Sequence, residues 1–237
     1  MTGARSGNLV ALNDALPATF SIYHDDPNTL TIDGGTASGK STLAYIMKGL
    51  YSNSCSRVQV VSIDWFLNPR RERAPLYAKL EAGEITIEEY HANTWDLHRF
   101  DLLIEQLVAA LGRTGEQNIE LDSIADRHSG ESIKKFQLEI SGRTFLILEG
   151  IGVLHPHRRP LPGPRIWVEA PSLDEVIERK FRRSQLRDHS TTRLLVASRY
   201  RKAEAKHDSW MAGLCKDRAD WLYVSNSSGV LTFRDRR

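Results

Sequence analysis

The sequence has little of several features that would restrict the protein to a particular class. Its 237 residues include only two cysteines, Cys55 and Cys215, which are too few for a disulfide framework and lack the spacing of zinc ligands. No stretch approaches the roughly 20 apolar residues of a membrane span, and the first thirty residues do not resemble a signal peptide. We therefore expect a cytoplasmic protein whose thiols are reduced.

An excess of charge of one sign is also missing. The formal net charge is +2, and no long basic run accompanies it, so nothing indicates nucleic acid or an anionic membrane as a partner. Hydrophobic residues make up 41% of the chain and charged residues 26%, the balance of an ordinary globular domain. We expect a single domain over residues 1–237 with a small molecule as its partner, and the sequence leaves open whether it forms a homodimer.

Strand-like runs alternate with helical patterns along the chain. The clearest strands are predicted at residues 29–33, 57–63, 144–148 and 165–169, with two short ones at 221–224 and 230–233. Helices are predicted after residue 40, over 97–111 and from Ser172. This alternation favours an α/β fold with a mostly parallel sheet, which binds ligands beyond the carboxyl ends of its strands.

Two segments show little regular pattern. Residues 68–95 are expected to be irregular and polar apart from one short helix, which Thr86 and Glu89 open at capping-box spacing. Residues 113–143 are expected to be rich in loops, with one alternating hairpin arm over 136–140. Loops beyond the strand ends commonly carry specificity.

Residues 34–41 read Gly-Gly-Thr-Ala-Ser-Gly-Lys-Ser, followed by Thr42, and fit the pattern G-x-x-x-x-G-K-[ST] in full. Glycines let the backbone curl around a phosphate, and the following helix presents its positive end to the same anion. Lys40 can then reach the β- and γ-phosphates, while the Ser41 hydroxyl can bind Mg²⁺. The expected phosphate-binding residues are Gly35, Thr36, Ala37, Ser38, Gly39, Lys40, Ser41 and Thr42.

Two acids follow the two most strand-like runs. Asp64 comes after residues 58–63 and Glu149 after residues 145–148. In a parallel sheet built around the glycine turn, both carboxylates approach the metal and the γ-phosphate. One can hold Mg²⁺ and the other can accept the proton of an attacking hydroxyl. The candidate metal ligands are Ser41, Asp64 and Glu149.

Arginines gather on the predicted helix after Ser172. Arg179, Arg182 and Arg183 lie opposite its apolar stripe, and guanidiniums near a triphosphate can stabilise charge in the transition state. A solvated basic face is the alternative. Elsewhere, His155 and His157 have a spacing that metal ligands can have, but no third ligand lies nearby in the sequence.

These motifs, in this order, resemble the uridine kinase / phosphoribulokinase family of P-loop kinases, which also contains nicotinamide riboside and pantothenate kinases. The glycine turn at 35–42 is very similar to the uridine kinase version, and Leu148-Glu149-Gly150-Ile151 matches the family's Glu-Gly-Ile strand end. Weaker similarities lie at residues 62–66, 93–101, 179–184 and 218–221.

The resemblance implies a P-loop three-layer α/β sandwich with a mostly parallel five-stranded core sheet and a helical lid at about residues 179–200, after an N-terminal extension at 1–28. It also implies that Asp64 is the catalytic base and Glu149 a carboxylate on the magnesium side. Arg179 and Arg183 would be catalytic lid cations, alongside Lys40. ATP with Mg²⁺ is the implied donor, and GTP stays an alternative.

The chain departs from the family pattern at the acceptor end. Leu67 stands where the family has tyrosine, Ser184 replaces an aspartate, and the nucleoside-binding Tyr-Asp-Phe with its following histidine has only a loose counterpart in Leu121-Asp122 and His128. These changes argue against uridine or cytidine as substrate. We expect acceptor-binding segments at about 68–95 and 113–135. Candidate substrate contacts in or beside them are Asp96, His98, Arg127 and His128.

The sequence therefore predicts a kinase that phosphorylates a hydroxyl of a nucleoside, a sugar or another hydroxylated metabolite, with antibiotics and their precursors among the candidates. The alternative is a regulatory nucleotide-binding NTPase without a small-molecule acceptor. The Asn-Lys-x-Asp motif of GTPases and the Leu-Ser-Gly-Gly signature of ATP-driven transporters are both absent from the sequence.

Overall fold

The structure is a computed structural model that describes residues 28–53, 55–113, 115–125, 132–186, 188–225 and 231–235. Within these ranges no helix has the length and apolar character needed to cross a membrane. The predicted N-terminal extension and the candidate contacts Arg127 and His128 lie outside the described residues, apart from Asn28 at the end of the extension.

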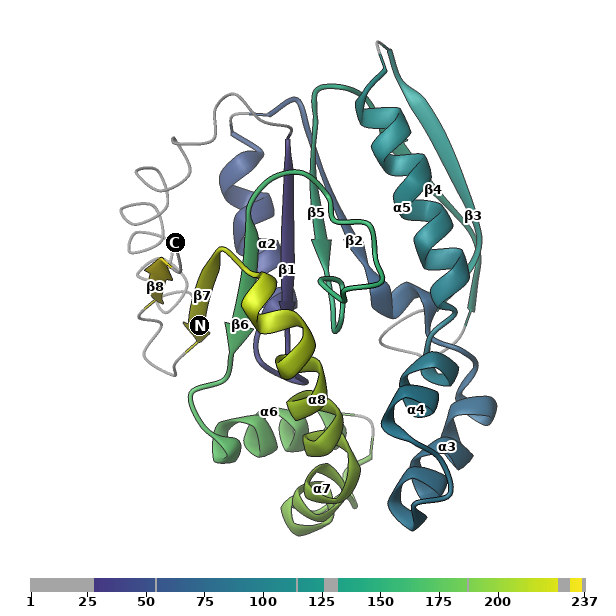
Figure 1. The fold of residues 1–237 in the computed structure, drawn as a ribbon, viewed down its shortest axis with the longest axis vertical. Coiled ribbons are helices and arrows are strands. Elements are labelled where there is room, and N and C mark those ends of the chain that lie inside the picture. Colours follow the sequence, from purple (N-terminus) through teal and green to yellow (C-terminus); the bar gives the residue numbers. More distant parts are fainter. Residues whose placement is uncertain are drawn as a thin grey trace.

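A six-stranded sheet forms the centre of the molecule (Figure 1). Its strands lie in the order β2-β5-β1-β6-β7-β8; the first five are parallel, and β8 joins the edge antiparallel to β7. The strand bounds are Thr29–Gly34 (β1), Arg57–Ser62 (β2), Thr144–Glu149 (β5), Arg165–Glu169 (β6), Trp221–Ser225 (β7) and Leu231–Asp235 (β8). The predicted parallel five-stranded core is confirmed.

Helices occupy most of the intervening chain. The α-helices are Lys40–Tyr51 (α2), Arg70–Ala82 (α3), Ile87–Thr94 (α4), Leu97–Leu111 (α5), Leu173–Gln185 (α6), Arg193–Arg199 (α7) and Ala205–Cys215 (α8). A π-helical turn, Tyr200–Glu204 (η3), connects α7 to α8, and two 3-10 turns lie at Ile63–Phe66 (η2) and Lys216–Arg218 (η4).

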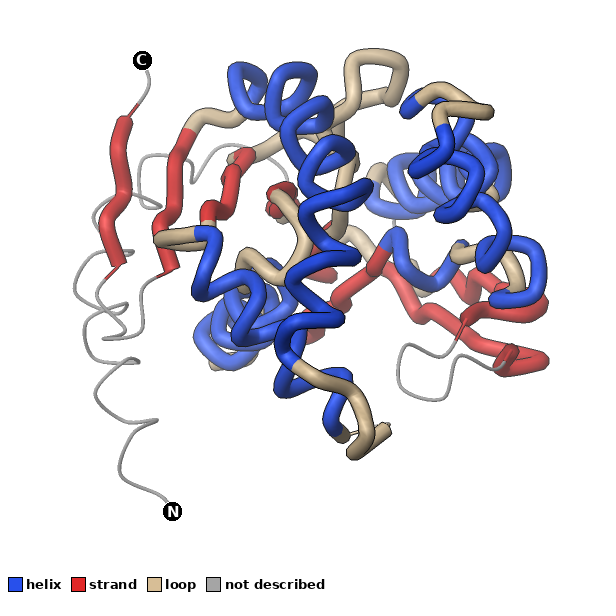
Figure 2. The backbone as a smooth tube through the Cα atoms, turned by 90° about the horizontal axis from the view of Figure 1, so that it is seen from below, coloured by secondary structure: helices blue, strands red, loops and turns tan. Residues whose placement is uncertain are grey.

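Both faces of the sheet are covered, because its central strands are apolar on both sides. Leu30, Ile32 and Ile147 pack against α2 on one face. On the other face, Leu146 and Leu148 pack against α5, while Trp167 packs against α8. Figure 2 shows the strands as a row with helices on either side. This arrangement is the expected three-layer α/β sandwich.

The two segments with little sequence pattern are more regular than expected. Residues 70–82 form helix α3, although Pro75 lies inside it and Leu80 is its only buried residue. The predicted capping box of α4 is present: Glu89 N donates to Thr86 Oγ1 at 3.1 Å and Thr86 N donates to Glu89 Oε2 at 2.7 Å. The predicted arm at 136–140 belongs to a hairpin of Gln117–Ala125 (β3) with Ser132–Ile140 (β4). The expectation of mostly irregular chain was therefore wrong for both segments.

Candidate active site

The glycine turn joins the end of β1 to the start of α2 at the carboxyl end of the parallel strands. Gly34 has φ 150°, and a Cβ there would lie 2.2 Å from the carbonyl oxygen of Val168. Gly39 has φ 110° and immediately precedes Lys40, the first residue of α2. Both positions therefore require glycine, and the amino end of α2 faces the turn as a phosphate site needs.

Lys40 lies at the centre of the site. Its Nζ donates to the carbonyl oxygen of Gly35 at 2.7 Å, and the residue is buried. Burial lowers the pKa of Lys40, while four nearby carboxylates oppose that shift. These are Glu149, Asp64, Asp33 and Asp208, in order of decreasing effect. The lysine thus faces both predicted acids and two that the sequence did not single out.

Ser41 and Glu149 form a pair of oxygen donors beside the lysine. The Ser41 hydroxyl donates to Glu149 Oε2 at 3.1 Å, and Glu149 is 3% exposed at the end of β5. A hydroxyl and a buried carboxylate at this separation suit a hard cation such as Mg²⁺, which prefers oxygen ligands and bound phosphate. The residues therefore fit the magnesium that the resemblance implies.

Asp64 lies in the short turn η2, directly after β2. The Ser62 hydroxyl accepts a hydrogen bond from the Asp64 amide at 3.2 Å and so caps the turn. Next to Asp64, the ring of Trp65 packs against Phe136 of the β3–β4 hairpin, with centroids 4.9 Å apart. The two strands of this hairpin include residues 117–125 and 132–135 of the predicted acceptor segment. The hairpin therefore lies beside the turn that carries Asp64.

Arg73 of α3 is a cation on this side of the site that sequence reasoning missed. Burial lowers its pKa, whereas Tyr90 of α4 and Asp64 act electrostatically to raise it. Its Nε donates to the carbonyl oxygen of Asn68 at 2.6 Å, which fixes the base of the guanidinium. Because α3 was expected to be irregular, no helical face was available to place this arginine.

Asp33 holds the glycine turn through hydrogen bonds to backbone amides. It is fully buried at the end of β1 and accepts backbone N–H bonds from Gly34 at 2.6 Å, Gly152 at 2.9 Å and Leu154 at 2.8 Å. Burial raises the pKa of Asp33, and the three amide donors and Lys40 oppose the rise. One carboxylate thus connects the glycine turn to the loop that follows Glu149.

Asp208 of α8 contacts the glycine turn through Thr36. Its Oδ1 accepts from both the amide and the hydroxyl of Thr36 at 2.9 Å, and its Oδ2 accepts from the Tyr200 hydroxyl at 2.8 Å. Asp208 is 172 positions from Thr36 in the sequence, so no local motif indicates the contact. The carboxylate holds a backbone amide of the phosphate-binding turn.

The predicted arginine face divides into different roles. Arg179 of α6 donates from Nη1 to the carbonyl oxygens of Ala37 and Ser38, at 3.2 and 3.0 Å, and so contacts the glycine turn. Arg182 is exposed and pairs with Glu178 at 2.8 Å. Arg183 is also exposed. Arg179 is thus held against the phosphate-binding turn, whereas Arg182 pairs within its own helix.

Asp96 and His98 were predicted to contact substrate. Asp96 caps α5, since its Oδ1 accepts from the Arg99 amide at 3.1 Å. Its own amide donates to the Phe66 carbonyl at 2.7 Å, which places it beside the turn that holds Asp64. His98 is exposed. The cap accounts for Asp96 without a ligand, and a substrate role for either residue stays a prediction.

A cluster of buried rings borders the site on the side of α8. His207, the neighbour of Asp208, pairs with His91 of α4 through Nε2···Nδ1 at 3.1 Å. Burial is the largest cause that lowers the pKa of His91 to about 3 and of His207 to about 4. His207, Arg158 and His155 also face His91 and lower its pKa further.

This histidine pair predicts a loss of stability in mild acid. An unfolded histidine binds its proton near pH 6.5, so between pH 6.5 and 4 the unfolded chain binds more protons than the folded one. From pH 7.5 to 5.5 each buried histidine should lower the free energy of unfolding by about 1.4 kcal/mol. Urea unfolding at the two pH values measures the fall. His207→Gln should reduce it and His98→Gln should not; an unchanged fall in His207→Gln would contradict this origin.

Comparison with known proteins agrees with the fold. No family model matches the sequence, and no curated protein matches it. Solved structures do match, and the chain has the fold of several small-molecule kinases. A possible uridine kinase from Bacillus stearothermophilus superposes with a TM-score of 0.60 at 17% identity, covering 90% of this chain and 97% of that one. A D-glycerate 3-kinase from Cryptococcus neoformans gives 0.52 at 13% identity, covering 97% and 95%.

Proposed function

We propose that the protein is an ATP-dependent small-molecule kinase that transfers the γ-phosphoryl group to a hydroxyl of a nucleoside, a sugar or another hydroxylated metabolite. The observation that carries the proposal is the convergence of Asp64 and Glu149 on Lys40 at the carboxyl ends of neighbouring strands. A phosphate-binding turn alone would support only nucleotide binding. A second carboxylate beside the lysine adds a proton acceptor for an attacking alcohol.

In the proposed mechanism the triphosphate lies along residues 34–41 with its charge met by Lys40 and the amino end of α2. Ser41 and Glu149 would hold Mg²⁺, which when bound neutralises charge on the phosphoryl oxygens. Arg179, fixed on the carbonyl oxygens of the turn, adds a third cation near the phosphates. Asp64 accepts the proton of the acceptor hydroxyl, and phosphoryl transfer depends mainly on this positioning of charges.

In this proposal the acceptor binds next to Asp64, where Phe136 of the β3–β4 hairpin contacts Trp65 and Arg73 of α3 acts electrostatically with Asp64. Arg73 supplies a guanidinium that acts on Asp64, so hydroxy acids belong among the candidate acceptors with nucleosides and sugars. Leu67, which replaces the family's tyrosine, bridges by backbone pairing to Trp95. Uridine itself is disfavoured by the sequence changes at this end.

The test is ADP release from Mg·ATP against a panel of nucleosides, sugars, hydroxy acids, vitamins and hydroxylated antibiotics. We expect at least one class to raise the rate about 100-fold or more above the basal rate. Lys40→Ala, which removes the cation that reaches the phosphates, should abolish the stimulated rate and weaken Mg·ATP binding. Basal release that no acceptor class stimulates would favour the alternative, a regulatory NTPase.

A further inference from the structure

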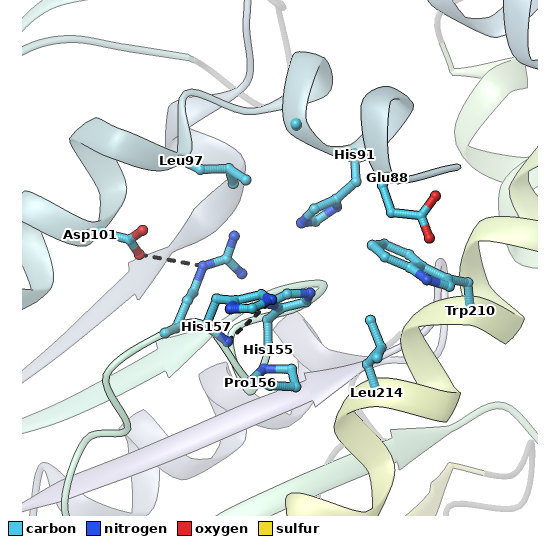
Figure 3. A pocket seen from close by; sticks show the side chains of 11 residues that line it. Glu88, His91, Leu97, Asp101, His155, Pro156, His157, Trp210 and Leu214 are labelled. Carbon is cyan, nitrogen blue, oxygen red and sulfur yellow. Dashed lines mark hydrogen bonds and ion pairs between the residues drawn. The ribbon is translucent and has the colours of Figure 1, made fainter. Parts of the chain in front are cut away.

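A cavity lies near the proposed phosphoryl-transfer site, and its walls come from other residues. It has a volume of about 470 Å³ and opens between α4, the start of α5, the loop after β5, and α8 (Figure 3). Its walls are Glu88, His91, Ala92, Leu97, Asp101, His155, Pro156, His157, Arg158, Trp210 and Leu214. Neither the glycine turn nor Asp64 or Glu149 is among these described residues. This size suits a small organic ligand.

Flat rings dominate the cavity wall. Trp95, His207 and His91 form a cluster in which all three ring centroids lie 5.0–5.8 Å apart, and His155 lies at 18° to His91 with centroids 6.0 Å apart. Of this cluster, His91 and His155 line the cavity, and Trp210 meets His91 edge-on at 63°. A planar ring is the shape that such a surface accommodates best, by stacking on one ring and meeting another by its edge.

A ring nitrogen of His91, in the cavity wall, lacks the partner that its burial demands. His91 is 4% exposed, and its Nε2 has no hydrogen-bond partner among the residues that the structure describes. Figure 3 shows the ring pointing into the cavity. His91 Nδ1 is engaged with His207, so Nε2 is either a bare acceptor or an unpaired N–H donor, depending on the tautomer. A buried polar atom in this state costs free energy until a ligand atom pairs with it.

The charged side chains around the cavity are either paired or exposed to solvent, so they do not indicate a charged ligand. Arg158 is 8% exposed, and its Nε lies 3.4 Å from Asp101 Oδ1, so the two charges balance at one end of the cavity. Glu88 is exposed at the other end. A metal is not indicated either, since no three histidine, cysteine or acidic residues in the described ranges are arranged to hold one. The metal alternative for His155 and His157 therefore has no structural support.

We propose that this cavity is a binding site for a small, uncharged, planar heteroaromatic ligand, separate from the triphosphate and Asp64. The ligand ring stacks on the imidazoles and pairs one ring heteroatom with His91 Nε2. His207 lies between the two sites: its ring contacts His91 in the cavity wall, and its neighbour Asp208 holds Thr36 of the glycine turn. The site does not depend on the proposed kinase activity.

Benzimidazole is a suitable probe, because it is neutral at pH 8 and carries one N–H donor and one nitrogen acceptor. Titrated into the ¹⁵N-labelled protein, it should shift the amide signals of α4, residues 155–158 and α8. We expect a dissociation constant on the order of 1 mM, as befits a fragment of this size. The signals of Lys40, Ser41 and Asp64 should move instead with Mg·ADP, and both ligands should bind together. Displacement of benzimidazole by Mg·ADP would overturn the separate site.

Two comparisons make the test specific. Indane, which has the same fused-ring shape without nitrogen, should bind roughly tenfold more weakly, because it leaves His91 Nε2 unpaired. Ala92→Phe places a ring at the exposed α4 wall and should weaken benzimidazole binding at least about tenfold by filling the cavity. Ala78→Phe, the same change at an exposed position of α3, should leave binding unchanged. Equal binding of indane, or equal binding by the Ala92→Phe variant, would contradict the proposal.

Discussion

Replacement of Asp64 by asparagine is expected to lower kcat by about 10³-fold, while the dissociation constant for Mg·ATP stays within roughly threefold of wild type. Asparagine has the same shape and can still complete the turn that the Ser62 hydroxyl caps. It cannot take up the proton of an attacking hydroxyl. The phosphate contacts come from the glycine turn, Lys40 and α2, and none of them depends on this side chain.

The measurement is single-turnover phosphoryl transfer together with equilibrium binding of Mg·ATP, using the acceptor that the panel identifies. Asp217→Asn is the matched control, because Asp217 is an exposed acid in η4, outside the predicted acceptor-binding segments. It should behave as wild type. Normal single-turnover chemistry in Asp64→Asn, with weakened Mg·ATP binding, would assign Asp64 to the metal instead of the proton.

The phosphate-binding side of the site was predictable because its residues form short, contiguous sequence motifs. The glycine turn, Lys40 and Ser41 are contiguous, and their geometry follows from φ angles that only glycine adopts easily at Gly39. Asp64 and Glu149 could be placed because each follows an apolar run that is typical of a strand, and these strands, β2 and β5, are neighbours in the sheet. Parallel strands then bring both acids to one edge of the sheet.

The remaining site residues could not be predicted, because their contacts join segments that lie far apart in the sequence. Asp208 meets Thr36 only because α8 packs across the sheet, and the two lie 172 positions apart. Asp33 was visible as the residue before the glycine turn, but its three amide partners include two from the loop after β5. Such residues become identifiable only when the fold supplies their partners.

Two elements were missed for a different reason. Helix α3 buries only Leu80 along its length, so its sequence shows little of the periodicity that marks a helix packed on a core. In β3, the buried side chains of Ile119 and Leu121 do alternate with exposed acids. Among the described strands it pairs with β4 alone and lies outside the main sheet, and its pattern is short and rich in polar residues with low strand propensity. Both elements flank the proposed acceptor region.

Replacement of Asp33 by alanine should have the largest effect on stability of any single change near the site. The carboxylate is 0% exposed and accepts three backbone N–H groups, which alanine would leave buried without a partner. At about 1–3 kcal/mol for each unsatisfied group, partly offset because a buried charge is also removed, we expect a loss of about 3–5 kcal/mol in the free energy of unfolding. Urea unfolding at pH 7.5 measures the loss.

Asp220→Ala separates burial from hydrogen-bond count. Asp220 also accepts three bonds, all from the backbone and guanidinium of Arg165, but its side chain is 18% exposed, so water can reach the groups left behind. Its loss should be about 1–2 kcal/mol. Similar losses in the two variants would contradict the role of burial.

A further consequence distinguishes Asp33 from an ordinary core residue. Because it connects Gly34 to the loop after Glu149, any Asp33→Ala protein that stays folded should bind Mg·ATP more weakly, whereas Asp220→Ala should bind it as wild type does.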